Sequence, residues 1–209
     1  MDRAMIEFMR RPATALALLV SLILMILAAA VPVTAQQSRI GAAPGDVAAL
    51  ERAILALGPG VDGGEAARAA RIAYAHTAEL ARAYQIADSP VIHNTKVNLG
   101  LKPRGLCWHW AHDIEKRLKA EGFRTLVVHR AVANFDAPFR LEHSTAILSR
   151  HGDPYTAGIV LDPWRLGGEL FWAPVAEDTR YDWRPRDEVL ALKRSRATAR
   201  ADRPVRIPR

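Results

Sequence analysis

The chain contains one cysteine, Cys107, and its position in the sequence is that of a possible nucleophile. A single thiol forms no intramolecular disulfide and supports no cysteine-based zinc site. The apolar periodicity that follows Gly105 predicts a helix beginning at Cys107. A helix N-terminus offers unpaired N–H groups and partial positive charge, which favour a thiolate. A buried, inert cysteine is the alternative, and catalysis additionally needs a base and a group that orients the base.

His143 and Asp162 are the candidates for these two roles. Residues 141–148 and 157–161 are short apolar runs typical of strands, and a Gly-Asp-Pro sequence between them predicts a turn. A symmetric hairpin centred between residues 152 and 153 would place His143 directly opposite Asp162, with Cβ atoms about 4.5–5.5 Å apart. That separation suits a carboxylate that holds an imidazole in one tautomer. A slip of one residue would move Asp162 to the other face of the sheet.

Three short motifs resemble those of transglutaminase-like domains, a branch of the papain-like cysteine enzymes. The sequence GLCWHWA at 105–111 resembles the motif of their cysteine-bearing helix. EHSTA at 142–146 looks like their histidine strand, and VLDPW at 160–164 looks like their aspartate strand. The order Cys, His, Asp and the gaps of 36 and 19 residues also fit, and the resemblance covers roughly residues 92–183.

This resemblance implies a catalytic triad in which Cys107 is the nucleophile, His143 the general base and then acid, and Asp162 the orienting residue. The implied reaction is attack on an amide or ester carbonyl, giving an acyl-enzyme that is released to water or to an amine. The backbone N–H of Cys107 would contribute to an oxyanion hole, with Asn98 or Asn94 as the second donor. The expected substrate is a peptide or protein, and no cofactor is implied.

Two other functions remain open at this stage. The chain could be a cell-wall endopeptidase of another papain-like branch, although those enzymes tend to carry Asp-Cys-Ser before the helix and Gly-His-Val at the histidine strand, and neither occurs here. It could also be a catalytically silent domain used for binding. Loss of a triad residue would support that second alternative, and none is lost.

Other histidines and tryptophans near Cys107 have simpler interpretations. His109 and His112 could suggest a metal site, but on a helix they project from the face opposite the thiol. We therefore expect a solvated face and no metal ligands. We expect Trp108 and Trp164, which adjoin two of the triad residues in the sequence, to line the cleft.

The order of the predicted elements indicates an α+β fold, with helices first and antiparallel strands after. A loop is predicted for residues 91–106. The predicted helices cover residues 47–57, 65–87 and 107–120, and the strands 126–132, 141–148, 157–161 and 170–175. A short helical turn at 188–193 is expected before the basic tail. The resemblance implies a papain-like core in which the cysteine helix packs on the sheet and two N-terminal helices precede it.

The N-terminus has the features of a targeting segment. Arg10 and Arg11 precede an apolar run from Ala13 to Val31, and residues 33–35 are typical of a signal-peptidase site. We expect cleavage before Gln36 and a periplasmic or extracellular protein. The alternative is that the apolar run stays as an N-terminal membrane anchor, because it is just long enough to span a bilayer.

The net charge of +7 is concentrated at the C-terminal end of the chain. Residues 184–209 carry nine Lys and Arg against three acidic residues, whereas residues 36–183 carry 17 of each. This distribution argues against a nucleic-acid-binding groove and indicates a disordered basic tail with weak contact, at most, to an anionic membrane or wall polymer. The expected organisation is a leader at 1–35, a linker and short helix at 36–62, a transglutaminase-like domain at 63–183 and the tail at 184–209.

Overall fold

The computed structural model describes residues 44–201, and residues 1–43 and 202–209 lie outside the described part. The expected signal peptide or anchor at 1–35 and most of the expected linker therefore fall outside it. Among the helices that are described, none has both the length and the apolar character needed to cross a membrane.

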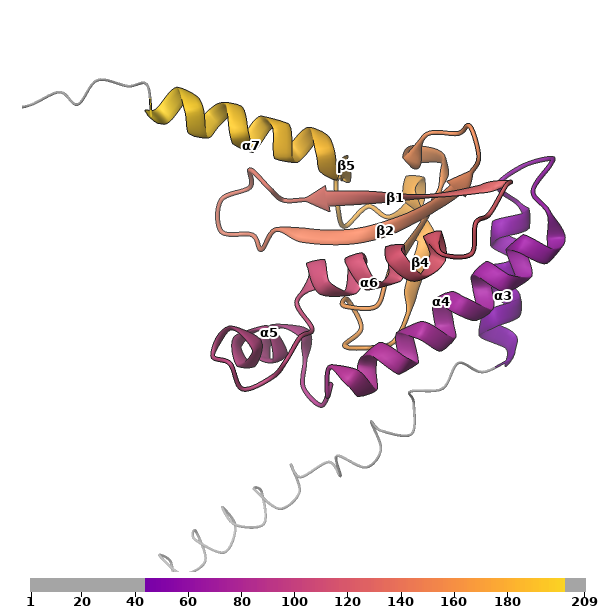
Figure 1. The fold of residues 1–209 in the computed structure, drawn as a ribbon, viewed down its shortest axis with the longest axis horizontal. Coiled ribbons are helices and arrows are strands. Elements are labelled where there is room, and N and C mark those ends of the chain that lie inside the picture. The colour runs from indigo at the N-terminus through magenta and orange to yellow at the C-terminus, as the bar shows by residue number, and fades with distance from the viewer. Residues whose placement is uncertain (1–43, 202–209) are drawn as a thin grey trace, which may run out of the picture. The chain divides into compact units, whose positions relative to one another are not determined.

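The described residues form an α+β fold of five helices and a five-stranded antiparallel sheet (Figure 1), which confirms the predicted class. The strands lie in the order β4-β3-β2-β1-β5. The helices are α3 (Pro44–Leu55), α4 (Gly63–Ala83), α5 (Pro90–Asn98), α6 (Cys107–Lys119) and α7 (Arg186–Ala201). The strands are β1 (Leu126–Ala133), β2 (His143–Arg150), β3 (Ile159–Asp162), β4 (Phe171–Pro174) and β5 (Arg184–Pro185).

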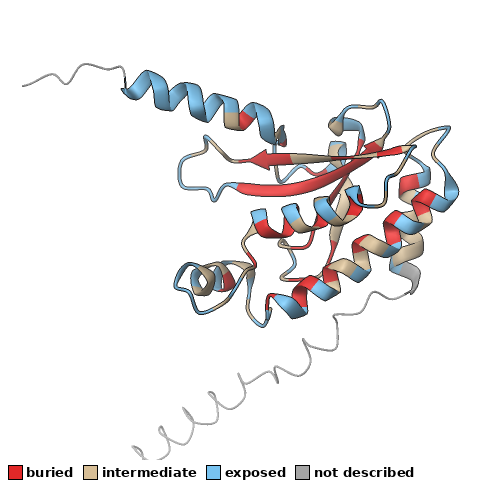
Figure 2. Cartoon of the chain, in the orientation of Figure 1, coloured by how far each residue is buried: buried red, intermediate tan, exposed pale blue. Residues whose placement is uncertain are grey.

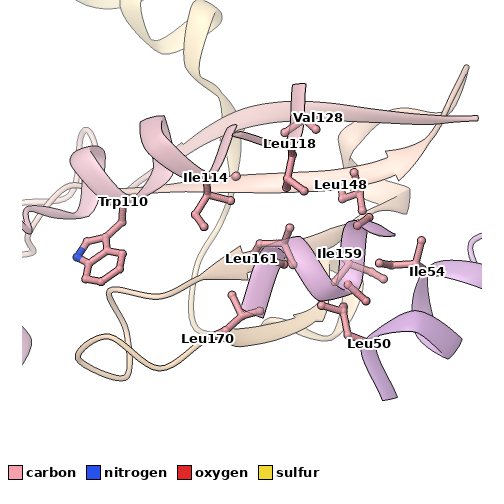
Figure 3. Close-up of a cluster of buried hydrophobic side chains, with 14 of the residues drawn as sticks. Leu50, Ile54, Trp110, Ile114, Leu118, Val128, Leu148, Ile159, Leu161 and Leu170 are labelled. Atoms are coloured by element: carbon pink, nitrogen blue, oxygen red, sulfur yellow. The ribbon is translucent and has the colours of Figure 1, made fainter. Parts of the chain in front are cut away.

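The main hydrophobic core joins α3, α4 and α6 to one face of the sheet (Figure 3). Trp110, Ile114 and Leu118 come from one side of α6, as the helical periodicity predicts, and each is at most 1% exposed. Leu50 and Ile54 of α3 are fully buried in the same core. The short helix that we grouped with the linker is thus part of the folded unit.

The start of α4 is fixed to the rest of the fold by a buried carboxylate. Asp62 caps the helix by accepting a hydrogen bond from the Glu65 N–H at 2.8 Å. The Glu65 carboxylate accepts hydrogen bonds from the backbone N–H groups of Arg124 and Thr125, at 2.9 and 2.8 Å. Burial opposes the charged form of Glu65, but these hydrogen bonds outweigh it and lower the pKa of the carboxyl. The connection from α6 into β1 is therefore held against α4.

Two helices correct the sequence-based expectations. Part of the segment predicted as a loop forms α5, which begins at Pro90, whose fixed φ suits the first helical position. Most of the segment predicted as a disordered tail forms α7, and residues 202–209 lie beyond the described chain. The apolar periodicity that predicts helices is weak in α7, because Val189 is its one buried residue. The acidic side chains of Asp187 and Glu188 in its first turn favour the helix electrostatically.

Candidate active site

Cys107 is the first residue of α6, as predicted, and its side chain is partly buried. The Cys107 sulfur lies 3.7 Å from the carbonyl oxygen of Glu142. Glu142 immediately precedes β2, so the first turn of the cysteine helix meets the beginning of the histidine strand. This contact answers the question that the sequence left open, namely whether the cysteine helix packs against the strands.

Side-chain contacts hold the segment that leads into Cys107 in place. Arg104 forms an ion pair with Asp113 at 2.9 Å, and the Trp110 indole donates to the carbonyl oxygen of Gly105 at 3.0 Å. His93 donates to the carbonyl oxygen of Arg104 at 2.9 Å. Gly105 has a φ of +127°, and a Cβ at this position would lie 2.4 Å from the His93 ring. Only glycine combines that backbone angle with that close approach.

His143 and Asp162 form a buried hydrogen-bonded pair. The His143 Nε2 lies 2.6 Å from Oδ2 of Asp162, and the two side chains are 2% and 1% exposed. The other ring nitrogen, Nδ1, is buried and makes no hydrogen bond within the described structure. Burial disfavours the charged imidazole, but the Asp162 carboxylate outweighs it, Cys107 adds to the effect, and the pKa of His143 is raised to about 9. The arrangement therefore favours an imidazolium that faces the thiol.

The register between β2 and β3 differs from the predicted one by two residues. Ala146 pairs with Leu161, and Leu148 pairs with Ile159. The prediction was wrong because the connection is asymmetric: the 3-10 turn Tyr155–Ala157 lies on the β3 side of the Gly-Asp-Pro turn. Since a shift of two keeps each side chain on its face, His143 and Asp162 are diagonal neighbours that still reach each other.

Arg165 and Asp178 form a second buried ion pair next to Asp162, which was not predicted from the sequence. Arg165 is 6% exposed and donates from Nε to Asp162 at 3.1 Å. Its two terminal nitrogens donate to both carboxylate oxygens of Asp178, at 3.0 and 2.8 Å, and the Trp183 indole donates to the same group at 2.9 Å. Burial disfavours the charged form of Asp178, but Arg165 and Trp183 outweigh it and lower the pKa of the carboxyl. Arg165 follows Asp162 by three residues, and this short spacing was the only feature of the sequence that could have indicated the contact between them.

Aromatic rings enclose the His143 imidazole. The ring centroids of Trp164 and Tyr181 lie 4.7 Å from that of His143, and the centroid of Trp183 lies 5.5 Å away. The Arg165 guanidinium stacks over Tyr181 as well, at 4.8 Å from the ring centroid. These contacts exclude water from the pair and restrict rotation of the imidazole.

Replacing Asp178 with asparagine is expected to lower the free energy of unfolding by about 3 kcal/mol, because it leaves the buried Arg165 guanidinium without its main counterion. We also expect Cys107 alkylation to slow, since the uncompensated positive charge disfavours the imidazolium of His143. Urea unfolding and iodoacetamide labelling measure the two effects. Asp153→Asn is the matched control, because the Asp153–Arg150 pair lies in an exposed turn and its loss should leave the free energy of unfolding close to that of the wild type. Equal stability losses in the two variants would contradict the role of the buried pair.

The structure places the two candidate oxyanion donors differently. Asn94 is partly buried on α5, and its side-chain oxygen accepts a hydrogen bond from the Trp164 indole at 3.0 Å. Trp164 itself packs against His143, so Asn94 is linked to the site and its amide NH₂ group is left as a donor. Asn98 is exposed at the end of α5. Trp108 is 50% exposed, beside Cys107 in the chain.

His109 corrects the expectation of a solvated histidine face on α6. It is buried, and its Nδ1 accepts hydrogen bonds from the backbone N–H groups of Gly105 and Leu106, both at 3.2 Å. Burial is the main cause that lowers the pKa of His109 to about 4, and the nearby Arg104 guanidinium adds to it. His109 thus acts as a neutral cap of its own helix, whereas His112 is exposed as predicted.

The cap predicts an unusual pH dependence for His109→Ala. At neutral pH the variant should lose about 1–2 kcal/mol of stability, because two N–H groups at the helix start lose their acceptor. The folded-state pKa of His109 lies below its unfolded value, so its contribution is present above about pH 6.5 and is lost toward about pH 4. Between about pH 7 and pH 5 the stability of the variant relative to the wild type should therefore rise by about 2 kcal/mol, so that the deficit disappears or reverses. Urea unfolding at both pH values measures it, and a deficit that stays constant, or one shared by His112→Ala, would refute the cap.

Among residues 44–201, no cluster of three or more His, Cys, Asp or Glu side chains is arranged to hold a metal ion. Comparison of the chain with protein families, with curated proteins and with solved structures found no match.

Proposed function

We propose that this chain is a cysteine enzyme of the transglutaminase-like branch of the papain-like fold, acting on amide or ester carbonyls. The observation that supports this proposal most directly is the arrangement of three side chains. Cys107 begins a helix, its sulfur lies at the start of the histidine strand, and His143 is bound through Nε2 to Asp162 while Nδ1 has no partner. A thiol, a base and an orienting carboxylate are the parts that nucleophilic catalysis by cysteine needs.

In the first half of the proposed reaction, the Cys107 thiolate attacks the substrate carbonyl carbon and forms a C–S bond. The carbonyl π electrons move to the oxygen, which becomes an oxyanion. The His143 imidazolium then gives its Nδ1 proton to the leaving amine or alkoxide, and the C–N or C–O bond breaks. The products are the free leaving group, a neutral imidazole and a thioester on Cys107.

In the second half, water or an amine attacks the thioester carbonyl. His143 takes a proton from this nucleophile, the C–S bond breaks, and the thiolate–imidazolium pair is restored. Asp162 keeps its charge throughout and stabilises the imidazolium in both halves. Hydrolysis and acyl transfer differ only in the nucleophile that enters.

The proposed oxyanion hole combines a backbone group and a side chain. The Cys107 N–H lies in the first turn of α6, where a helix provides no acceptor, and it is therefore able to bind the oxyanion. We assign the second donor to the Asn94 amide, because its hydrogen bond with Trp164 fixes it near His143. The exposed position of Asn98 makes it the weaker candidate.

The papain-like core and the cellular setting belong to the same proposal. A helix that carries cysteine on its first residue and packs on an antiparallel sheet supports the core, and the adjacent strands supply His143 and Asp162. The N-terminal targeting features support action on peptides or proteins outside the cytoplasm. The basic residues of α7 could add weak contact with an anionic membrane or wall polymer.

The acyl-enzyme is the intermediate that tests this proposal. Para-nitrophenyl acetate should acetylate Cys107 with a burst of nitrophenol that equals the enzyme concentration, and intact mass should show one added acetyl group. Cys107→Ala should show neither, and Asp153→Asn should behave like the wild type. Addition of glycine amide then separates transfer from hydrolysis. Nitrophenol release at the same rate in wild type and Cys107→Ala would leave a binding domain as the better interpretation.

A further inference from the structure

Exposed apolar side chains gather around the proposed active site. Ten large hydrophobic side chains of the described chain are exposed, and eight of them come from three neighbouring regions. These regions are α5 with the turn that follows it, the loop between β1 and β2, and two positions near the proposed triad, one beside Cys107 and one in the turn after β3. The first region contributes Val91, Ile92, Leu99 and Leu101. The loop contributes Phe139 and Leu141, and the third region contributes Trp108 and Leu166.

These regions meet at the end of the fold where α6 begins. Figure 1 shows α5, the N-terminal end of α6 and the β1–β2 loop on the same side of the molecule, and Figure 2 shows the β1–β2 loop as mostly exposed. The 3.7 Å contact between the Cys107 sulfur and Glu142 ties the loop to the thiol. The hydrogen bond between Asn94 and Trp164 ties α5 to the ring that packs on His143. Concentrated apolar exposure of this kind is typical of an interaction surface.

Phe139 combines full exposure with an unfavourable backbone conformation. Its side chain is fully exposed, at 107% of the reference area, and its φ is +63°. A left-handed backbone is unfavourable for a bulky residue, and an exposed ring contributes no burial that would offset the strain. Leu141, two residues further on and one before Glu142, is 60% exposed. Neither side chain belongs to the buried core of the described chain.

We infer that the β1–β2 loop, through Phe139 and Leu141, binds a large apolar side chain of the substrate on the acyl side of the attacked carbonyl. The inference rests on the proposed function, and it names the substrate class as polypeptide segments rich in large apolar residues. Peptides built from small and acidic residues, such as cell-wall stem peptides, fit this surface poorly. The contact of the loop with the thiol makes an acylating substrate the occupant that its position favours.

Peptide chloromethyl ketones test the inference, because the Cys107 sulfur bonds to the methylene carbon while the C–Cl bond breaks and chloride leaves. The probes are acetyl-Ala-Ala chloromethyl ketones extended by Phe, Leu, Ala or Glu next to the reactive group. The readout is the ratio of labelling rates within each protein, which cancels a general change in thiol reactivity. In the wild type we expect the Phe and Leu probes to react about tenfold faster than the Ala probe. The ratio should fall toward one in Phe139→Ser and Leu141→Ser and stay unchanged in Leu55→Ser, whose exposed leucine lies on α3.

The other outcomes are distinguishable. Equal rates for all probes, or a preference for Glu, would overturn the inference and leave the proposed function standing, provided that iodoacetamide labels Cys107 normally. A preference that survives in both loop variants would overturn the assignment to this loop. A concentration-dependent dimer that Phe139→Ser abolishes would show a second copy as the occupant instead. Failure of iodoacetamide and of every probe to label Cys107 in the folded wild type would overturn both the proposed function and the inference.

Discussion

Replacing His143 with alanine is expected to slow the alkylation of Cys107 by iodoacetamide about 100-fold at about pH 6. The reason is the charge state of the partner. His143 has a pKa raised to about 9, so at this pH it is an imidazolium. In the proposed reaction this positive charge stabilises the thiolate form of Cys107. An ordinary thiol, with a pKa of about 8.5, is almost fully protonated at about pH 6 and reacts slowly. The measurement is the second-order labelling rate, followed by intact mass.

Two controls make the His143 result specific. His129→Ala removes another strand histidine, which binds Ser149 and has no contact with the thiol, and it should label like the wild type. His143→Gln keeps a polar side chain beside Asp162 but carries no positive charge, so it should be as slow as His143→Ala. If His143→Gln labels at the wild-type rate, the thiol does not depend on an imidazolium and the triad assignment is wrong.

Asp162→Asn is expected to slow the same labelling about tenfold, less than loss of the imidazole itself. Asparagine keeps the size of the side chain but removes the charge that raises the pKa of His143, and it can favour the wrong tautomer. The variant should fold, because Arg165 retains Asp178 as a partner. Asp153→Asn is again the control, and Glu142→Gln tests the competing carboxylate next to His143. A collapse of labelling in Glu142→Gln with a normal rate in Asp162→Asn would reassign the third member of the triad.

The same variant changes how stability depends on pH. The folded-state pKa of His143, at about 9, lies above its ordinary value of 6.5, so the folded protein binds the proton more tightly than the unfolded chain. This contribution is fully present below about pH 6.5, is lost as the pH rises through about 9, and amounts to at most about 3 kcal/mol. Asp162→Asn should therefore be most destabilised, relative to the parent, at about pH 6 and less so at about pH 9.

Urea unfolding at these pH values measures the difference, with Cys107→Ser in both proteins so that the thiol does not titrate in the same range. A difference in the free energy of unfolding between parent and Asp162→Asn that widens toward high pH would contradict the ion pair of His143 and Asp162.

Local patterns were sufficient to predict the positions of Cys107, His143 and Asp162 on their elements. The apolar periodicity of α6 gave its start at Cys107, and the alternating runs gave the strands that carry His143 and Asp162. The register was wrong by two residues, because the 3-10 turn at 155–157 has no strong sequence signal. His143 and Asp162 still lie on the same face of the sheet only because the shift was by an even number of residues.

Contacts between segments that are distant in the sequence could not be predicted from local patterns. Asp178 and Trp183 reach the Asp162 side chain only through Arg165, and no periodicity links residues on separate turns and strands. His109 was predicted to be solvated from its helical angle, but the chain before α6 folds back over it and supplies two N–H donors. Only a short helical turn at 188–193 was expected where α7 forms, because this segment buries one side chain and the helix depends on backbone propensity and terminal charges.

The central claim is that Cys107 and His143 form a thiolate–imidazolium pair, and the pH dependence of wild-type labelling tests it most directly. Iodoacetamide should alkylate Cys107 at a rate that changes by no more than about threefold between about pH 5.5 and pH 8, because the pair persists across this range. A rate that instead rises about tenfold with each pH unit up to about pH 8.5 would show an ordinary thiol and would contradict the account.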